Sequence, residues 1–196
     1  MPLKILVIDS EAERARSLAE TLNGAGFDDV VRVDAQADLI ETVRRVAPDL
    51  VVMDMALPDR DALESVRSLS AAAPRPIVMF ADEDEPALVE EAIAAGVCSY
   101  NLSGVSTRDM KAIVASAVAL FRRHARVETE LAAAKAQLEE RRIVERAKAM
   151  LMAERKLTEP QAYRWLRTKA MNDNRRIAQV AAELLKGDEA DALLKP

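Results

Sequence analysis

Residues 50–54 read LVVMD, and this short run decides how the first half of the chain folds. Four apolar residues end in a carboxylate, and residues 3–9, which read LKILVID, end in the same way. Apolar runs of this kind are typical of strands in a parallel sheet that helices cover on both faces. Further strands are expected at residues 30–34, 77–81 and 98–102, where short apolar or β-branched runs recur.

Amphipathic segments separate these strands. They lie near residues 11–23, 36–47, 60–72 and 85–95, and a further one begins near residue 107. Strands that alternate with helices through short connections predict a doubly wound α/β domain. We therefore expect a five-stranded parallel sheet with the flavodoxin-like strand order.

Composition restricts the class of protein. No apolar run approaches the roughly 18 residues of a membrane span, and the first residues lack the pattern of a secretion signal, so a cytoplasmic protein without membrane contact is expected. One cysteine, Cys98, and one histidine, His124, exclude an internal disulfide and argue against a zinc site. Residues 1–107 hold 20 acidic and 9 basic residues, whereas residues 108–196 hold 13 acidic and 19 basic ones, so the second half is the candidate for binding a polyanion.

Two carboxylates mark a candidate site in the acidic half. Asp9 and Asp54 follow the first and third expected strands, and ligands of such sheets bind beyond the carboxyl ends of the strands. A carboxylate pair suits a hard cation, so Asp9 and Asp54 are candidate Mg²⁺ ligands. The sequence contains neither a phosphate-binding glycine loop nor a dinucleotide motif. We therefore expect a protein that is not an enzyme and requires no cofactor.

With these residues the chain resembles a response-regulator receiver domain over residues 1–120. The resemblance implies that Asp54 is the candidate phosphoacceptor, that acids after the first strand hold a metal, and that a hydroxyl and a lysine sense the phosphate. Here Ser10 replaces the second acid, Ala81 the hydroxyl residue and Ser103 the lysine. These departures favour a pseudo-receiver that is kept for docking rather than for phosphorylation.

A heptad pattern follows the receiver-like region. A helix is expected from residue 107 to residue 155, with a coiled-coil linker at 107–141, because no Gly or Pro interrupts it. Its seam alternates spacings of four and three residues, which predicts a homodimer. The seam residues are Ile113, Ala117, Leu120, His124, Val127, Leu131, Ala134 and Leu138.

The basic end predicts a three-helix unit. Thr158 and Gln161 form a capping-box pattern with a proline between them, which starts the second helix. Asp173 is expected to cap the third helix, and Gly187 is expected to end it.

Motifs in this unit resemble the ANTAR family over residues 135–190. They read AKAMLM at 147–152, EPQAYRWLR at 159–167 and NRRI at 174–177. The resemblance implies an all-α transcription antitermination module, which binds as a dimer to paired stem-loops in tandem in a leader RNA. Hairpin loops expose unpaired bases that a small helical module can read, and cations are needed to hold the phosphates.

The candidate RNA-binding residues are the basic side chains of this unit and one tyrosine. Positions within the family motifs favour Lys148, Arg167 and Arg176 most strongly. Tyr163 could stack on a base or could belong to the core. The full set is Arg142, Arg146, Lys148, Tyr163, Arg164, Arg167, Arg175 and Arg176.

The order of the regions also resembles the NasT-type regulators of nitrate and nitrite assimilation, in part through the tract at 74–80. That resemblance implies that a cytoplasmic nitrate-sensing partner sequesters the regulator until nitrate arrives. The alternative is a two-component response regulator that binds DNA after phosphorylation, because an acidic receiver with a basic helical end is also built for that purpose.

Overall fold

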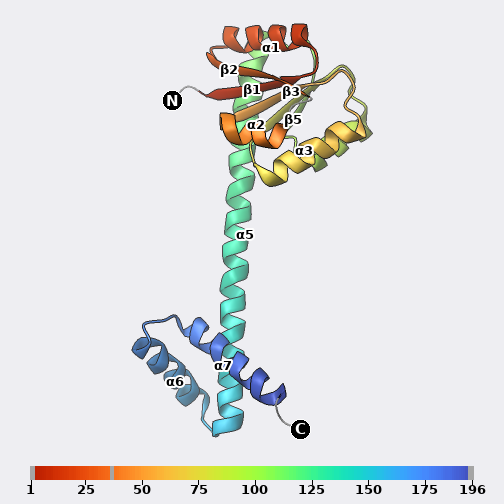
Figure 1. The fold of residues 1–196 in the computed structure, drawn as a ribbon. Helices are drawn as coiled ribbons and strands as arrows, with labels where there is room; N and C mark the ends of the chain where they lie inside the picture. The colour runs from red at the N-terminus through yellow and green to blue at the C-terminus, as the bar shows by residue number, and fades with distance from the viewer. Residues whose placement is uncertain (1–2, 36–37, 194–196) are drawn as a thin grey trace. The chain divides into compact units, whose positions relative to one another are not determined.

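The computed structural model describes residues 3–35 and 38–193 and divides the chain into two compact units, Met1–Ala125 and Arg126–Pro196 (Figure 1). The first unit is an α/β domain, and the second is helical. One helix, α5 (Thr107–Arg155), contributes residues to both units.

The first unit contains the expected five-stranded sheet. All its strand pairs are parallel, and the order β2-β1-β3-β4-β5 is the flavodoxin-like one. The prediction of the fold is therefore confirmed. The strands are β1 (Lys4–Asp9), β2 (Asp29–Asp34), β3 (Leu50–Asp54), β4 (Ile77–Ala81) and β5 (Ser99–Leu102).

Helices cover both faces of this sheet (Figure 1). Alternate strand residues point to opposite faces, so Ile5 packs with α1 and the first turns of α5, whereas Leu6 packs with the other three helices. Both residues are fully buried, as expected for a central strand. The covering helices are α1 (Ala12–Gly24), α2 (Leu39–Val46), α3 (Arg60–Ala72) and α4 (Pro86–Ala95).

Helix α2 begins later than the sequence pattern indicates. The Asp38 carboxylate accepts a hydrogen bond from the Glu41 backbone N–H at 3.0 Å, so Asp38 is the N-cap. The predicted start at residues 36–37 lies outside the described residues.

The second unit is a bundle of three helices. The end of α5 packs against α6 (Glu159–Asn172) and α7 (Ile177–Leu193) around buried Leu151, Leu166 and Val180. Trp165 packs at the edge of this core, and the Arg155 guanidinium carbon lies 4.8 Å from the centre of its ring. The expected all-α unit is thus present.

Two predictions about α7 are wrong. Gly187 does not end the helix, which continues to Leu193; one interior glycine costs a helix only about 1 kcal/mol, which the rest of α7 offsets. Asp173 does not cap α7, because it ends α6 and pairs with Lys169 at 3.2 Å.

The predicted seam residues of α5 lie in two different environments along the helix. Ala117 is fully buried and Ile113 is partly buried, both against the sheet, so neither is available to a second copy of the chain. Farther along, the apolar seam residues are about half exposed or more, at 51–60 %: Leu120, Val127, Leu131 and Leu138. None of the helices in residues 3–35 and 38–193 combines the length and the hydrophobicity that a bilayer span requires.

Candidate nucleic-acid interface

The acidic end of the sheet brings Asp9 and Asp54 together. They follow the paired residues Ile8 and Met53 on neighbouring strands, and both are almost fully buried. Ser103, at the position where the receiver pattern expects lysine, donates a hydrogen bond from Oγ to Asp54 Oδ1 at 3.3 Å. The carboxylate of Asp54 therefore meets a hydroxyl where the pattern would place a cation.

A cation is supplied at this end by Arg14, which sequence reasoning missed. Its guanidinium pairs with Asp9 at 2.9 Å and lines a small cavity together with Asp54 and Ser103. Burial raises the pKa of Asp54, and the charge of Asp9 raises it further, whereas Arg14 and the Ser103 hydrogen bond act in the opposite direction. The sequence signal for this contact was the position of Arg14, which lies five residues after the aspartate that ends β1 and on the first turn of α1.

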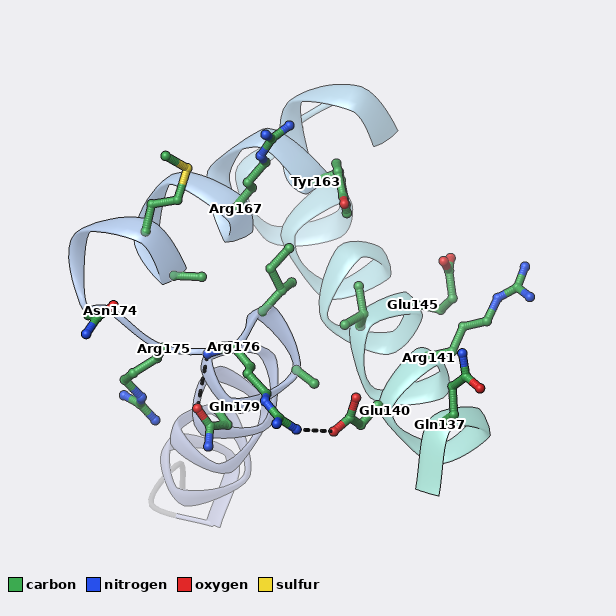
Figure 2. A pocket seen from close by; sticks show the side chains of 15 residues that line it. Gln137, Glu140, Arg141, Glu145, Tyr163, Arg167, Asn174, Arg175, Arg176 and Gln179 are labelled. Atoms are coloured by element: carbon green, nitrogen blue, oxygen red, sulfur yellow. Dashed lines mark hydrogen bonds and ion pairs between the residues drawn. The ribbon is translucent and has the colours of Figure 1, made fainter. Parts of the chain in front are cut away.

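The second unit contains a much larger groove, of about 1150 Å³, between the end of α5, α6 and the start of α7 (Figure 2). It is lined by four arginines, two glutamates, several amides and one aromatic ring. These are Arg141, Arg167, Arg175, Arg176, Glu140, Glu145, Gln137, Asn174, Gln179 and Tyr163, with an apolar floor that includes Val144 and Ala170. The groove therefore combines positive charge, polar groups and an apolar floor.

Helix α6 contributes the aromatic side of the groove. Tyr163 and Arg167 are four residues apart and thus lie on the same face of the helix, whereas Leu166, farther round toward α5 and α7, is fully buried in the core. Tyr163 is 44 % exposed. Tyr163 therefore lines the groove and is not part of the buried core, and its stacking on a base stays a prediction.

The turn between α6 and α7 contributes the basic side. Asn174 has a φ of +50°, a left-handed conformation that asparagine tolerates better than most residues. This turn is followed at once by Arg175, which pairs with Glu183 at 2.6 Å, and by Arg176, which pairs with Glu140 at 3.7 Å. Figure 2 shows Arg176 reaching from the α7 side toward Glu140 on α5.

The backbone of Arg176 starts α7. Its N–H donates to Gln179 Oε1 at 3.1 Å, and its carbonyl accepts from the backbone N–H groups of Gln179 and Val180. Arg176 is thus the residue that immediately precedes α7 and accepts its first backbone hydrogen bonds. Its side chain, at 79 % exposure, remains free of the core.

The structure brings only part of the predicted set into the groove. Tyr163, Arg167, Arg175 and Arg176 line it together. Three other predicted residues are exposed but do not line it: Arg142, Arg146 and Arg164.

Lys148 has a different environment. It is 8 % exposed, and its Nζ lies 2.9 Å from Glu145 Oε2 and 2.7 Å from Glu159 Oε1. Hydrogen bonds to these two carboxylates raise the pKa of Lys148, and the same contact lowers the pKa of Glu159. This lysine ties α5 to the first turn of α6 and is not a free cation in the groove.

Sequence reasoning missed six polar residues of the groove, two of which are Glu140 and Glu145. Gln137 and Arg141 are four residues apart on α5, and the sequence signal was the interruption of the apolar seam at Arg141. Asn174 entered only as the first residue of the motif at 174–177, and Gln179 was not singled out. Their approach to the groove depends on how three helices pack, which no spacing along one helix reveals.

Comparison with known proteins identifies both units. Residues 5–115 match the family model of the response regulator receiver domain, and residues 132–185 match that of the ANTAR domain. The groove residues therefore lie within or next to the ANTAR match.

Similarity to characterised relatives supports the same division of the chain into a receiver unit and an ANTAR unit. The transcriptional regulatory protein PdtaR of Mycobacterium tuberculosis is 32 % identical over 188 residues, which cover 94 % of this chain and 92 % of PdtaR. The DNA-binding response regulator MtrA of Mycobacterium leprae is also 32 % identical, but over 58 % of this chain and 50 % of MtrA. The likeness to PdtaR thus includes both units, and it does not single out the NasT-type subgroup.

Solved structures agree on the receiver fold. The signal receiver domain of NarL from Mycobacterium tuberculosis superimposes with a TM-score of 0.51 at 20 % identity, covering 59 % of this chain and 95 % of that one. A CheY-like receiver domain protein from Methanospirillum hungatei gives a TM-score of 0.54 at 18 % identity, covering 63 % and 99 %. With both domain matches and the full-length likeness to PdtaR, the chain belongs to the response regulators in which a receiver domain is joined to an ANTAR RNA-binding domain.

Proposed function

We propose that this protein is a transcription antitermination regulator whose ANTAR groove binds the loops of paired hairpins in a leader RNA. The observation that carries the proposal is the groove itself, in which Tyr163 and four arginines converge from three helices within the matched ANTAR domain. Binding of the hairpins keeps the competing terminator from forming.

The chemistry of the groove suits an RNA loop. Single-stranded loops present unstacked bases, which proteins recognise by stacking on aromatic rings and by hydrogen bonds to base edges. Tyr163 offers an exposed ring for stacking, and the amides of Asn174 and Gln179 offer both donors and acceptors. Arg167 and Arg175 lie beside them and supply charge for the flanking phosphates.

Binding of two paired hairpins requires two RNA-binding units, and we propose that a homodimer provides them. The support is the exposed apolar seam of α5, in which Val127, Leu131 and Leu138 keep heptad spacing. Exposed large apolar residues in such a row are typical of a protein–protein contact. Linking two modules raises the affinity for a tandem site without any new contact to each hairpin.

Control of the regulator is proposed to depend on release from a protein partner rather than on phosphorylation of Asp54. Ala81 and Ser103 replace the residues that would sense a phosphate, and the Asp54 carboxylate accepts a hydrogen bond from the Ser103 hydroxyl. The narrower part of the proposal, a cytoplasmic nitrate-sensing partner and nitrate and nitrite assimilation transcripts, rests on the resemblance of residues 74–80. Sequencing of RNA that co-purifies with the protein, with and without nitrate, tests this part.

The binding experiment uses the full-length protein and fluorescently labelled RNA. Tandem hairpins, a single hairpin and duplex DNA are compared at several salt concentrations, and tandem RNA is expected to bind most tightly. Tighter binding of duplex DNA would support the alternative of a DNA-binding response regulator and contradict the proposal.

A matched pair of variants tests the groove. Arg167→Ala removes a groove cation, and Arg164→Ala removes an exposed arginine of the same helix that does not line the groove. We expect Arg167→Ala to weaken binding by 1–3 kcal/mol or, if Arg167 meets only phosphate, to reduce the salt slope by about one. Arg164→Ala is expected to have little effect. Equal losses in the two variants would remove the groove from the proposal.

A further inference from the structure

Arg14 occupies the position at the acidic end of the sheet where receiver domains are expected to hold a metal. Its Nη2 donates to Asp9 Oδ1 at 2.9 Å, and its Nε lies 3.3 Å from Asp9 Oδ2. The two contacts form a fork that engages both oxygens of one carboxylate, the arrangement for which guanidinium is suited. The Asp9 side chain has no exposed surface, and that of Arg14 is 27 % exposed.

The carboxylates of Asp9 and Asp54 have few acceptor sites left for a metal ion. Asp9 Oδ1 also accepts the backbone N–H of Glu11 at 2.7 Å, so this oxygen already has two donors. Asp54 Oδ1 accepts the Ser103 hydroxyl at 3.3 Å. A carboxylate oxygen has about two lone-pair sites. Asp9 Oδ1 is therefore saturated by groups of the chain itself.

The site also lacks the ligands that Mg²⁺ needs. Ser10 is an exposed serine at the position of the second acid, and among the side chains described in residues 3–35 and 38–187 no three of His, Cys, Asp or Glu converge as a metal cluster. Magnesium prefers oxygen ligands with negative charge, whereas here a permanent positive charge already pairs with Asp9. These residues do not fit a divalent metal.

We propose that Arg14 is the resident cation of this site and that it takes the place of a divalent metal between Asp9 and Asp54. The guanidinium offsets one of the two buried negative charges and holds Asp9 through its fork. It also lines the cavity of about 160 Å³ into which Asp54 and Ser103 face. The receiver domain is therefore fully assembled without metal, and the proposal is independent of what the ANTAR groove binds.

Arg16 provides a matched control for this proposal. It lies two residues later on the same helix, is exposed and pairs with exposed Glu13 at 3.3 Å. Arg16→Gln therefore removes the same charge from α1 and leaves the fork between Arg14 and Asp9 in place. Arg14→Gln opens the site, and Arg14→Lys keeps the charge but loses the fork.

The experiment measures Mn²⁺ binding, as a spectroscopic substitute for Mg²⁺, to the full-length protein by electron paramagnetic resonance. Wild type, Arg16→Gln and Arg14→Lys are expected to bind no Mn²⁺ in the millimolar range. Arg14→Gln is expected to bind it with a dissociation constant at least about tenfold below the highest Mn²⁺ concentration at which the wild type shows no binding, because a repelling charge beside the site has been removed. A double variant that adds Asp54→Asn is expected to lose this gain.

A second measurement requires no variant. The thermal unfolding midpoint of the receiver unit in the wild type is expected to be the same in Mg²⁺ and in chelator, because nothing that binds only the folded state is added or removed. A midpoint that rises with Mg²⁺ would overturn the proposal. So would equal Mn²⁺ affinities in the wild type and in Arg14→Gln, whether both bind or neither does.

Discussion

Replacement of Lys148 tests whether this residue of the family motif contacts RNA or holds the ANTAR unit together. The side chain is 10 % exposed, so most of its methylene stem is buried between α5 and α6. Truncation to alanine removes three methylenes at about 0.8 kcal/mol each, so Lys148→Ala is expected to lower the free energy of unfolding by about 2 kcal/mol. Lys148→Met keeps most of the stem and loses only the contacts to two exposed carboxylates, which contribute little.

The protein contains a convenient probe for this measurement. Trp165 is the only tryptophan and packs against the core of the second unit. Its fluorescence in urea titrations of the full-length chain therefore follows the unfolding of that unit. We expect Lys148→Ala to shift the midpoint clearly and Lys148→Met to shift it by less than half as much.

RNA affinity then separates the two roles of Lys148. At a temperature where Lys148→Met remains folded, its affinity for tandem hairpins is expected to stay within about twofold of wild type, a difference of some 0.4 kcal/mol. Glu159→Gln is a useful companion, because it removes one partner of the lysine without adding or removing a basic residue. Unchanged stability with a large loss of RNA affinity in Lys148→Met would refute the reasoning, since the lysine would then act as a ligand.

Three further predictions concern the receiver unit and the seam. Burial raises the pKa of Asp54 in the folded state. The stability that Asp54 contributes is therefore greatest at low pH and is lost as pH rises through the raised pKa. Asp54→Asn should raise the melting temperature at neutral pH, and this gain should vanish below about pH 4. Gly96 has a φ of +110°, and an added Cβ would lie 2.8 Å from Ser70 Cβ. Gly96→Ala should therefore lower the free energy of unfolding, measured by thermal unfolding, by about 2 kcal/mol or more. Gly26→Ala, at φ +90° in open space, should lower it clearly less. Leu131→Asp places a charge on the exposed seam and should shift full-length protein from dimer to monomer in sedimentation; an unchanged mass would argue against the seam.

The fold of the first unit could be predicted from the sequence because its signals are local. The apolar runs before Asp9 and Asp54 mark strands buried on both faces, and the helices between them follow from amphipathic spacing. The errors lie at helix ends. Gly187 is a common stop signal, but α7 continues past it to Leu193.

The candidate site could be predicted only in part, because it depends on where three helices place their side chains. Arg167 and Arg176 were recognised from the family motif, and both line the groove. Lys148 was recognised in the same way, yet its position on the inner face of α5 directs it to Glu145 and Glu159. Arg14 was missed because its role depends on a contact with Asp9 that composition does not reveal.

The main chain and the side chain of Arg176 have separate roles. Its main-chain atoms initiate α7, and any residue other than proline can supply them, whereas its long side chain extends into the groove. Under the proposed function, folding and RNA recognition thus depend on different atoms of one residue. Replacements of Arg176 are then expected to alter the RNA preference with little change in the free energy of unfolding.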